Sequence, residues 1–220
     1  MSLELAISEV FKTYNSGPVL KGCSFSFDKS GIYVLTGRNG CGKSTFLRIC
    51  SLIEEPDEGE IIFRSGGHLV KKDMELKRRM TLLLPKVGVF NTTVFGNVAY
   101  GLIIRGLNRK GIEEKVNTAL DFVGLSHKRN QKALTLSSGE TQRLGIARAI
   151  VIEPEIIFLD EPTASVDPTN TEAIEEIILK MKKDQGSVVV ITTHDVAQAE
   201  RLADRLLLIQ DGKILERTVC

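Results

Sequence analysis

The apolar residues of this chain follow strand-type patterns in some segments and helical spacing in others. In the first third, polar residues separate Leu3, Leu5 and Ile7, and this alternation predicts a half-buried strand. Continuous apolar runs fill residues 32–35, 156–159 and 188–191. Runs of this length are expected for strands whose two faces are both buried, as in a parallel sheet covered by helices.

The middle of the chain has a different period. From Thr92 to about Ile152, apolar residues recur at helical spacing, and this segment is too long for an ordinary crossover between two strands. It therefore predicts a helical lobe inserted over residues 86–152. Near the end of the chain, Asp211 and Gly212 separate two apolar runs, which indicates a hairpin. We expect one α/β domain over residues 1–220, with a mostly parallel sheet, a small antiparallel section and the inserted lobe.

Composition narrows the classes of partner. Lysine and arginine number 29 against 28 acids, a net charge of +1 at pH 7, so charge alone predicts neither nucleic acid nor an anionic membrane as partner. No signal peptide is evident at Met1, and the longest apolar runs have strand length, so a membrane role would require a partner protein. Four cysteines, at positions 23, 41, 50 and 220, lack metal-ligand spacing. A disulfide at Cys41 would block the motif described next, so we expect a reducing cytosol.

Residues 37–45 read Gly-Arg-Asn-Gly-Cys-Gly-Lys-Ser-Thr and fit G-x-x-x-x-G-K-[ST], the phosphate-binding loop of nucleotide hydrolases. A predicted strand precedes the loop and a helical pattern follows it, whereas a glycine-rich turn that matched by chance would lack this context. The glycines let successive N–H groups point at phosphate oxygens at a helix start. We expect Lys43 to reach the β- and γ-phosphates and the Ser44 hydroxyl to ligate Mg²⁺.

Two acids, Asp160 and Glu161, directly follow the apolar run 156–159. Ligands of α/β proteins bind at the carboxyl ends of parallel strands. We expect Asp160 to hold Mg²⁺, directly or through water, and Glu161 to polarise the attacking water. An exposed acidic turn before Pro162 is the alternative, and the phosphate loop favours the functional interpretation.

Two further segment ends carry candidate residues. Residues 136–140, Leu-Ser-Ser-Gly-Glu, precede a helical pattern; serine and glycine there make an ordinary N-cap, and the same geometry makes a second anion site. His194 follows the run 188–191. A lone histidine is most often structural, but at the same sheet edge as Asp160 and Glu161 it favours a contact with the γ-phosphate.

These motifs, in this order, resemble the nucleotide-binding subunit of ATP-binding cassette (ABC) transporters over essentially the whole chain. The family's signature corresponds to residues 136–140, its Walker B strand to 156–161, its D-loop to 164–167 and its switch histidine to His194. The resemblance implies an ATPase in which Tyr14, otherwise an ordinary surface tyrosine, stacks on adenine. It also implies head-to-tail pairs, in which each signature closes on the ATP of the other subunit. The resemblance implies three catalytic residues: Lys43, the general base Glu161 and the γ-phosphate sensor His194. It implies Ser44 and Asp160 as Mg²⁺ ligands. The implied nucleotide contacts are Tyr14, Asn39, Gly40, Cys41, Gly42, Lys43, Ser44, Thr45, Ser137, Gly139 and Asp167.

The sequence departs from the family at two positions. Signatures usually have two glycines, and Ser138 replaces the first of them. The larger departure is Pro85, which occupies the place of a glutamine that contacts Mg²⁺ and the coupling helix of the transporter. Proline has neither a side-chain amide nor a backbone N–H, so both contacts are in doubt.

The resemblance also indicates partners. A permease on a separate polypeptide, a second ABC ATPase subunit (in a homodimer) and a solute-binding protein are expected, with no nucleic acid, and the subunit is expected in the cytoplasm on the inner face of the membrane. Residues 85–94, 97–102 and 161–168 are similar to ATPase subunits of tungstate and related oxyanion importers. Export is an alternative. So is an ABC ATPase that acts on a macromolecular assembly, although such relatives usually carry two cassettes or long insertions. A phosphate-loop kinase would leave the signature and His194 without a role.

Overall fold

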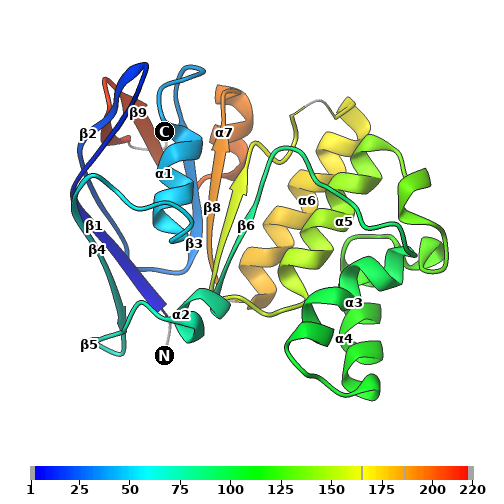
Figure 1. Ribbon diagram of the computed structural model, residues 1–220. Helices are drawn as coiled ribbons and strands as arrows, with labels where there is room; N and C mark the ends of the chain where they lie inside the picture. Colours follow the sequence, from blue (N-terminus) through cyan, green and yellow to red (C-terminus); the bar gives the residue numbers. More distant parts are fainter. Residues whose placement is uncertain (1–2, 165, 186, 218–220) are drawn as a thin grey trace. The chain divides into compact units, whose positions relative to one another are not determined.

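The computed structural model describes residues 3–164, 166–185 and 187–217 (Figure 1). Met1, Ser165 of the predicted D-loop and Cys220 lie outside these ranges. In chain order the elements are β1 (Leu3–Tyr14), β2 (Gly17–Phe27), β3 (Gly31–Thr36), α1 (Lys43–Cys50), β4 (Glu58–Ser65), β5 (His68–Leu69), α2 (Met74–Arg78), β6 (Met80–Leu83), α3 (Val94–Ile104), α4 (Arg109–Phe122), η1 (Ser126–Lys128), η2 (Ala133–Thr135), α5 (Ser138–Ile150), β7 (Ile156–Asp160), α6 (Pro168–Gln185), β8 (Val188–Thr193), α7 (Val196–Leu202), β9 (Arg205–Gln210) and β10 (Lys213–Arg217).

The chain divides into two units. The first comprises Met1–Leu82, Glu155–Glu161 and Met181–Cys220; the second comprises Leu83–Pro154 and Pro162–Lys180. Each unit is described by itself. The second unit holds the helices that were predicted as an inserted lobe, and the boundaries given for that lobe, about residues 86–152, stay a prediction.

Two sheets dominate the first unit. One has the order β10-β9-β3-β8-β7-β6. In this sheet β3 is parallel to β8 and β9, and β7 is parallel to β8. Among the pairings described, only β10 is antiparallel to its neighbour, β9, with which it forms a hairpin. The other sheet, β2-β1-β4-β5, is antiparallel. Every residue of β3, β7 and β8 is buried. The predicted α/β fold with a mostly parallel sheet and an antiparallel section is confirmed.

The core of the first unit fixes α1 between its two sheets, as Figure 1 shows for the cyan helix beside β3. The Phe27 ring, from β2, lies with its centroid 5.0 Å from that of Tyr33 in β3 and 6.4 Å from that of Phe46 in α1. All three side chains are at most 1% exposed. Burial of such rings contributes about 1.5–3 kcal/mol each, so the start of α1, where the phosphate loop ends, is held firmly.

The second unit is helical, and polar side chains cap its helices. Thr93 accepts a hydrogen bond from the Gly96 amide at the start of α3, and Asn108 accepts one from the Gly111 amide at the start of α4. α3, α4 and α5 pack against one another around apolar side chains such as Val98 and Leu144, which are fully buried. Within the described ranges of the chain, no helix is long and apolar enough to cross a bilayer.

Candidate functional site

The phosphate loop joins β3 to α1, and its backbone requires glycine. Gly42, the residue just before α1, has φ = 109°, and an added Cβ would lie 2.8 Å from Val19 Cγ1. A side chain here would be strained and crowded. Because glycine offers no side chain to cap α1, the first amides of this helix lack a side-chain cap and are suited to an anion.

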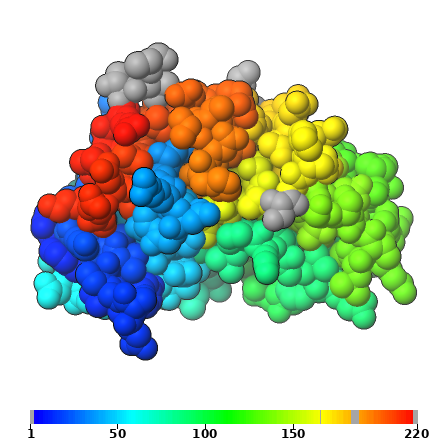
Figure 2. All heavy atoms as spheres, turned by 90° about the horizontal axis from the view of Figure 1, so that it is seen from above, coloured from blue at the N-terminus to red at the C-terminus, as the bar shows by residue number. Residues whose placement is uncertain are grey.

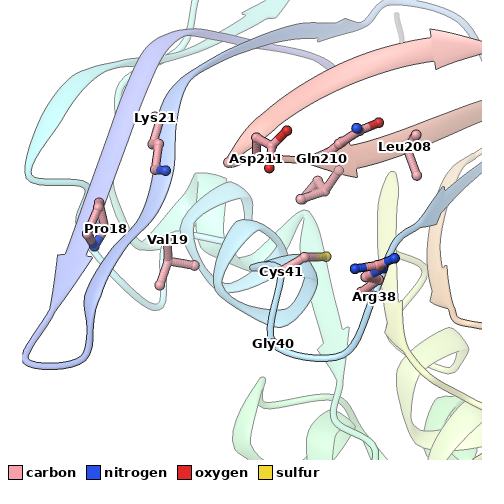
Figure 3. A pocket seen from close by; sticks show the side chains of 11 residues that line it. Pro18, Val19, Lys21, Arg38, Gly40, Cys41, Leu208, Gln210 and Asp211 are labelled. Carbon is pink, nitrogen blue, oxygen red and sulfur yellow. The ribbon is translucent and has the colours of Figure 1, made fainter.

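Two hollows flank the loop within the first unit. The larger, about 550 Å³, lies between β2, the loop and the β9–β10 turn, and Figure 3 shows Cys41 facing it between Val19 and Arg38. The smaller, about 450 Å³, extends from Asn39 to His194 and α7. Figure 2 shows the blue spheres of the loop region at the surface beside the orange spheres of α7. A ligand can therefore reach the loop from either side.

Thr192, in β8, holds the two predicted acids at the end of β7. Its hydroxyl donates to Asp160 Oδ1 at 2.6 Å and accepts a hydrogen bond from the Glu161 amide at 2.9 Å. Asp160 is 2% exposed and Thr192 fully buried. Glu161 has φ = 45°, a region that residues other than glycine rarely adopt and that is enriched at functional sites. One hydroxyl thus fixes both the Asp160 carboxylate and the turn that presents Glu161.

The Glu161 carboxylate lies between two other predicted site residues. Lys43 Nζ is 3.6 Å from Glu161 Oε1, and His194 Nδ1 is 3.5 Å from Glu161 Oε2. The Lys43 side chain is 5% exposed and also donates to the carbonyl oxygens of Gly37 and Arg38, at 3.0 and 3.3 Å. The fold therefore brings Lys43, Glu161 and His194 together at the carboxyl edge of the parallel sheet. A phosphate group would compete with these oxygens for the ammonium.

In the second unit, Ser137 caps α5. Its hydroxyl accepts a hydrogen bond from the Glu140 amide at 3.3 Å, and the Glu140 carboxylate accepts one from the Ser137 amide at 3.0 Å. This is a capping box. Lys128 Nζ lies 2.5 Å from Glu140 Oε1, and its hydrogen bond is the main cause that lowers the pKa of Glu140. The sequence reasoning found Ser137 but gave no role to Lys128.

Gly139, a predicted nucleotide contact, packs close to the predicted D-loop. A Cβ at Gly139 would lie 2.3 Å from Asn170 Cγ. The backbone N–H of Asn170 donates to Asp167 Oδ1 at 3.0 Å, and its side-chain Nδ2 donates to Asp167 Oδ2 at 2.8 Å. The second unit therefore places Gly139 and Asp167 near each other, at the starts of α5 and α6.

Pro85 lies in the segment between β6 and α3, and this segment is fastened to helices of the second unit. The buried Asn97 side chain accepts from the Phe90 amide at 2.8 Å and donates to the Phe90 carbonyl at 3.1 Å. Arg148 donates to the Gly88 carbonyl at 2.6 Å, and its guanidinium lies 4.8 Å from the Phe90 ring centroid. No glutamine stands at this point of the chain, and these contacts hold the backbone without one.

Tyr14 is the last residue of β1, where it pairs with Gly17 across a short turn. Its hydroxyl lies 3.5 Å from the Thr45 hydroxyl at the start of α1, so the structure brings the predicted adenine contact beside the phosphate loop. Sequence reasoning missed three polar contacts: Thr192 with Asp160, Lys128 with Glu140, and Glu54, whose carboxylate accepts a hydrogen bond from the Tyr14 hydroxyl. A polar residue in an apolar strand was the available signal for Thr192, since parallel pairing sets it beside Asp160.

Comparison with known proteins identifies the family of this chain. The sequence matches the family described as ABC transporter over residues 20–164. It is 35% identical to the tungstate uptake system ATP-binding protein TupC of Peptoclostridium acidaminophilum, over 97% of this chain and 98% of that protein. It is also 35% identical to the phosphate import ATP-binding protein PstB 2 of Natronomonas pharaonis, over 96% of this chain and 78% of that protein.

Two solved structures have the same fold. CbiO1 from Clostridium perfringens, part of the ABC transporter complex CbiONQ, superposes with a TM-score of 0.87 at 27% identity over 98% of this chain and 88% of that one. The ATP-binding cassette MJ0796, in a dimeric post-hydrolysis state with ADP and phosphate, gives a TM-score of 0.85 at 25% identity over 98% and 99%. The chain belongs to the ABC transporter family, as an ATP-binding subunit that hydrolyses ATP for transport.

Proposed function

We propose that Lys43, Glu161 and His194 are the residues that carry out ATP hydrolysis in this chain. The position of the Glu161 carboxylate, within 3.6 Å of Lys43 and 3.5 Å of His194, supports the proposal most strongly. Lys43 binds the β- and γ-phosphates, and His194 contacts the γ-phosphate. Glu161 accepts a proton from the water that attacks the γ-phosphorus as the bond to the ADP oxygen breaks. Little covalent chemistry is required beyond positioning and charge stabilisation.

The oxygen donors near the loop fit Mg²⁺. Among the described residues, no group of three histidine, cysteine or acidic side chains could form a complete protein cage for a metal. Asp160 and the Ser44 hydroxyl instead offer the sparse set that Mg²⁺ takes when substrate phosphates and water complete its shell. When bound, Mg²⁺ neutralises charge on the β- and γ-phosphates. Asp160 and Ser44 hold it, and the Thr192 hydroxyl orients the Asp160 carboxylate.

The subunit works as a head-to-tail pair, in which Ser137 and Gly139 of one copy contact the ATP held by residues 39–45 of the other. The capping box at Ser137 leaves α5 with an ordered N-terminus, and a helix start of this kind favours anions. Asp167 belongs to the same contact surface. The dimeric state of MJ0796 in its structure supports the pairing.

The transporter imports a small solute, and an oxyanion of the tungstate or molybdate type is the class we propose. TupC, a tungstate uptake protein, and PstB 2, a phosphate import protein, are both equally similar to this chain. Methionine import proteins of Oceanobacillus iheyensis and Listeria monocytogenes are 33–35% identical, so a different solute is the competing outcome. A separate permease and a solute-binding protein complete the system. The permease places the subunit on the inner face of the membrane.

The first experiment replaces the proposed base. Glu161→Gln keeps the size of the side chain but removes its basicity, so turnover should fall by a factor of ~10² or more, while ATP binding survives. Size-exclusion chromatography with MgATP should then show a monomer-to-dimer shift. A second change, Ser137→Arg, should abolish this shift. Near wild-type hydrolysis by Glu161→Gln would refute the role of Glu161, and a dimer that forms despite Ser137→Arg would refute the head-to-tail pairing.

The second experiment addresses the solute. Cells that lack this chain, and cells that carry its Glu161→Gln variant, are compared with wild type for accumulation of tungstate, molybdate, phosphate and methionine. Loss of tungstate or molybdate uptake alone supports the proposed class. Loss of methionine or phosphate uptake alone assigns a different solute, and a loss of efflux would contradict import.

A further inference from the structure

The aromatic ring beside the phosphate loop is held by a residue to which the proposed mechanism gives no role. The Tyr14 hydroxyl donates to Glu54 Oε1 at 2.5 Å. Glu54 lies in the loop between α1 and β4, and its side chain is 22% exposed. Hydrogen bonds from a hydroxyl to a carboxylate are short and are about twice as strong as neutral ones. The orientation of the Tyr14 ring is therefore fixed at its outer end.

Glu54 is itself fastened by two cations. Arg48 in α1 donates from Nε to Glu54 Oε2 at 3.1 Å, and Lys12 Nζ lies 3.5 Å from Glu54 Oε1. Partial burial alone would raise the pKa of Glu54, but the hydrogen bonds from Tyr14 and Arg48 outweigh burial, and the pKa lies below its ordinary value. Glu54 is thus a carboxylate at neutral pH.

The same loop binds the end of β1 at a second point. Lys12 Nζ donates to Asp57 Oδ1 at 3.0 Å and to the Glu55 carbonyl at 2.8 Å. Asp57 Oδ2 accepts a hydrogen bond from the Thr13 amide at 2.7 Å. The two residues that precede Tyr14 are therefore attached to the loop that carries Glu54, so the backbone and the hydroxyl of Tyr14 are both fixed.

This network reaches the phosphate loop. Arg48 Nη2 donates to the Thr45 hydroxyl at 3.3 Å, and Thr45 is one of the loop's proposed nucleotide contacts. Arg48 thus contacts Glu54 with one nitrogen and Thr45 with another. Because all these residues belong to the first unit, the distance between the ring and the phosphate loop does not depend on the second unit.

We propose that Glu54 is a positioning residue for the nucleotide base: through the Tyr14 hydroxyl it holds the ring as a stacking platform, and through Arg48 it sets the reach from this platform to the phosphate loop. The inference rests on the proposed role of Tyr14 in stacking. A ring that is already ordered loses less conformational freedom when the base binds. Glu54 should therefore affect the affinity for ATP and leave the chemical step unchanged.

The test compares ATP with inorganic tripolyphosphate, which has phosphates but no base. Glu54→Ala and Tyr14→Phe each remove one side of the hydrogen bond, and each should weaken ATP binding and raise KM for ATP roughly three- to tenfold. The kcat should stay within about twofold, and the Kd for tripolyphosphate should not change. The double variant should bind ATP no more weakly than Glu54→Ala alone, because Glu54→Ala already removes the hydrogen bond that Tyr14→Phe removes. Glu55→Ala, a change of an exposed neighbour, is the matched control and should behave as wild type.

Three results would overturn the inference or its premise. Unchanged ATP affinity in Glu54→Ala, together with weakened affinity in Tyr14→Ala, refutes the role of Glu54 and leaves the platform intact. Unchanged ATP affinity in Tyr14→Ala refutes the stacking role itself, and with it that part of the proposed function. Equal weakening of ATP and tripolyphosphate by Glu54→Ala shows that Glu54 acts on the phosphate loop and not on the base. Should Glu54→Ala fail to fold, Tyr14→Phe tests the same hydrogen bond with an intact loop.

Discussion

Thr192→Val tests whether one hydroxyl holds the catalytic edge of the sheet. Valine has nearly the same shape as threonine, so the change leaves no cavity, but it removes the donor to Asp160 and the acceptor for the Glu161 amide. A hydrogen bond to a charged acceptor contributes about 1.5–3 kcal/mol and a neutral one about 0.5–1.5 kcal/mol. Since Thr192 is fully buried, water does not replace either bond. We expect the free energy of unfolding to fall by about 2–4 kcal/mol.

For a chain of 220 residues, this loss corresponds to a decrease in Tm of roughly 5–15 °C. The turn at Glu161 also loses the partner of its amide, so the carboxylate should shift from its place beside Lys43 and His194. A small misplacement of a general base is enough to lower kcat on the order of tenfold. The affinity for ATP should change little, because Lys43 and the loop amides are untouched.

Differential scanning calorimetry and steady-state ATPase assays measure both effects. Thr36→Val is the matched control: this buried β3 threonine makes one neutral hydrogen bond, to the Leu207 carbonyl at 3.0 Å. It should lose only about 1 kcal/mol and keep its kcat. If Thr192→Val is no less stable than Thr36→Val, or if its kcat matches wild type, the argument that Thr192 holds the two acids is wrong.

Three further predictions concern other parts of the site. Pro85→Gln supplies an amide at the position where the family has one, so it should lower the Mg²⁺ concentration for half-maximal hydrolysis by about tenfold; an unchanged Mg²⁺ titration would mean that another group already fills this place. In a Cys220→Ser background, N-ethylmaleimide should label Cys41 selectively, because Cys41 is only half-buried whereas Cys23 and Cys50 are fully buried. Burial also raises the pKa of the Cys23 and Cys50 thiols, to about 11 for Cys23. MgATP at about ten times its Kd should slow this labelling roughly tenfold, and equal rates with and without MgATP would contradict the placement of Cys41 at the nucleotide. Gly139→Ala should cost about 1–3 kcal/mol in urea denaturation, because its Cβ would lie 2.3 Å from Asn170 Cγ; adding Asn170→Ala should recover part of this loss, and failure to do so would locate the cost elsewhere.

The sequence predicted the fold wherever the pattern was local. Fully apolar runs become β3, β7 and β8, because strands buried on both faces need no polar positions. The rule that parallel strands end at one edge placed Glu161 and His194 near the phosphate loop, and the structure has them together. Their chemical roles stay predictions. The helical pattern predicted after the phosphate loop is α1, and this helix ends at Cys50, because Leu52 has φ = 58°, which is incompatible with a right-handed helix.

The missed residues act through contacts that no local pattern shows. Thr192 looks like any polar residue in an apolar strand until the register sets it beside Asp160. Glu54 lies 40 residues from Tyr14 in sequence, in a loop whose charges resemble ordinary surface charges. Lys128 is the last residue of η1 and contacts Glu140 beyond η2, and neither of these short helices was predicted. Each of these pairs depends on how distant segments pack, which periodicity and motif spacing do not determine.

At Glu161, the needs of folding and of ATP hydrolysis conflict: its left-handed backbone favours another residue, whereas hydrolysis requires the carboxylate. A residue other than glycine in this conformation destabilises the fold by about 1–3 kcal/mol, and glycine or asparagine would relieve much of that strain. Neither can serve as a base. Copies of this gene released from the need to hydrolyse ATP should therefore drift towards glycine or asparagine at position 161, and gain stability as they lose function. A glutamate kept there in spite of the strain is a mark of an active ATPase.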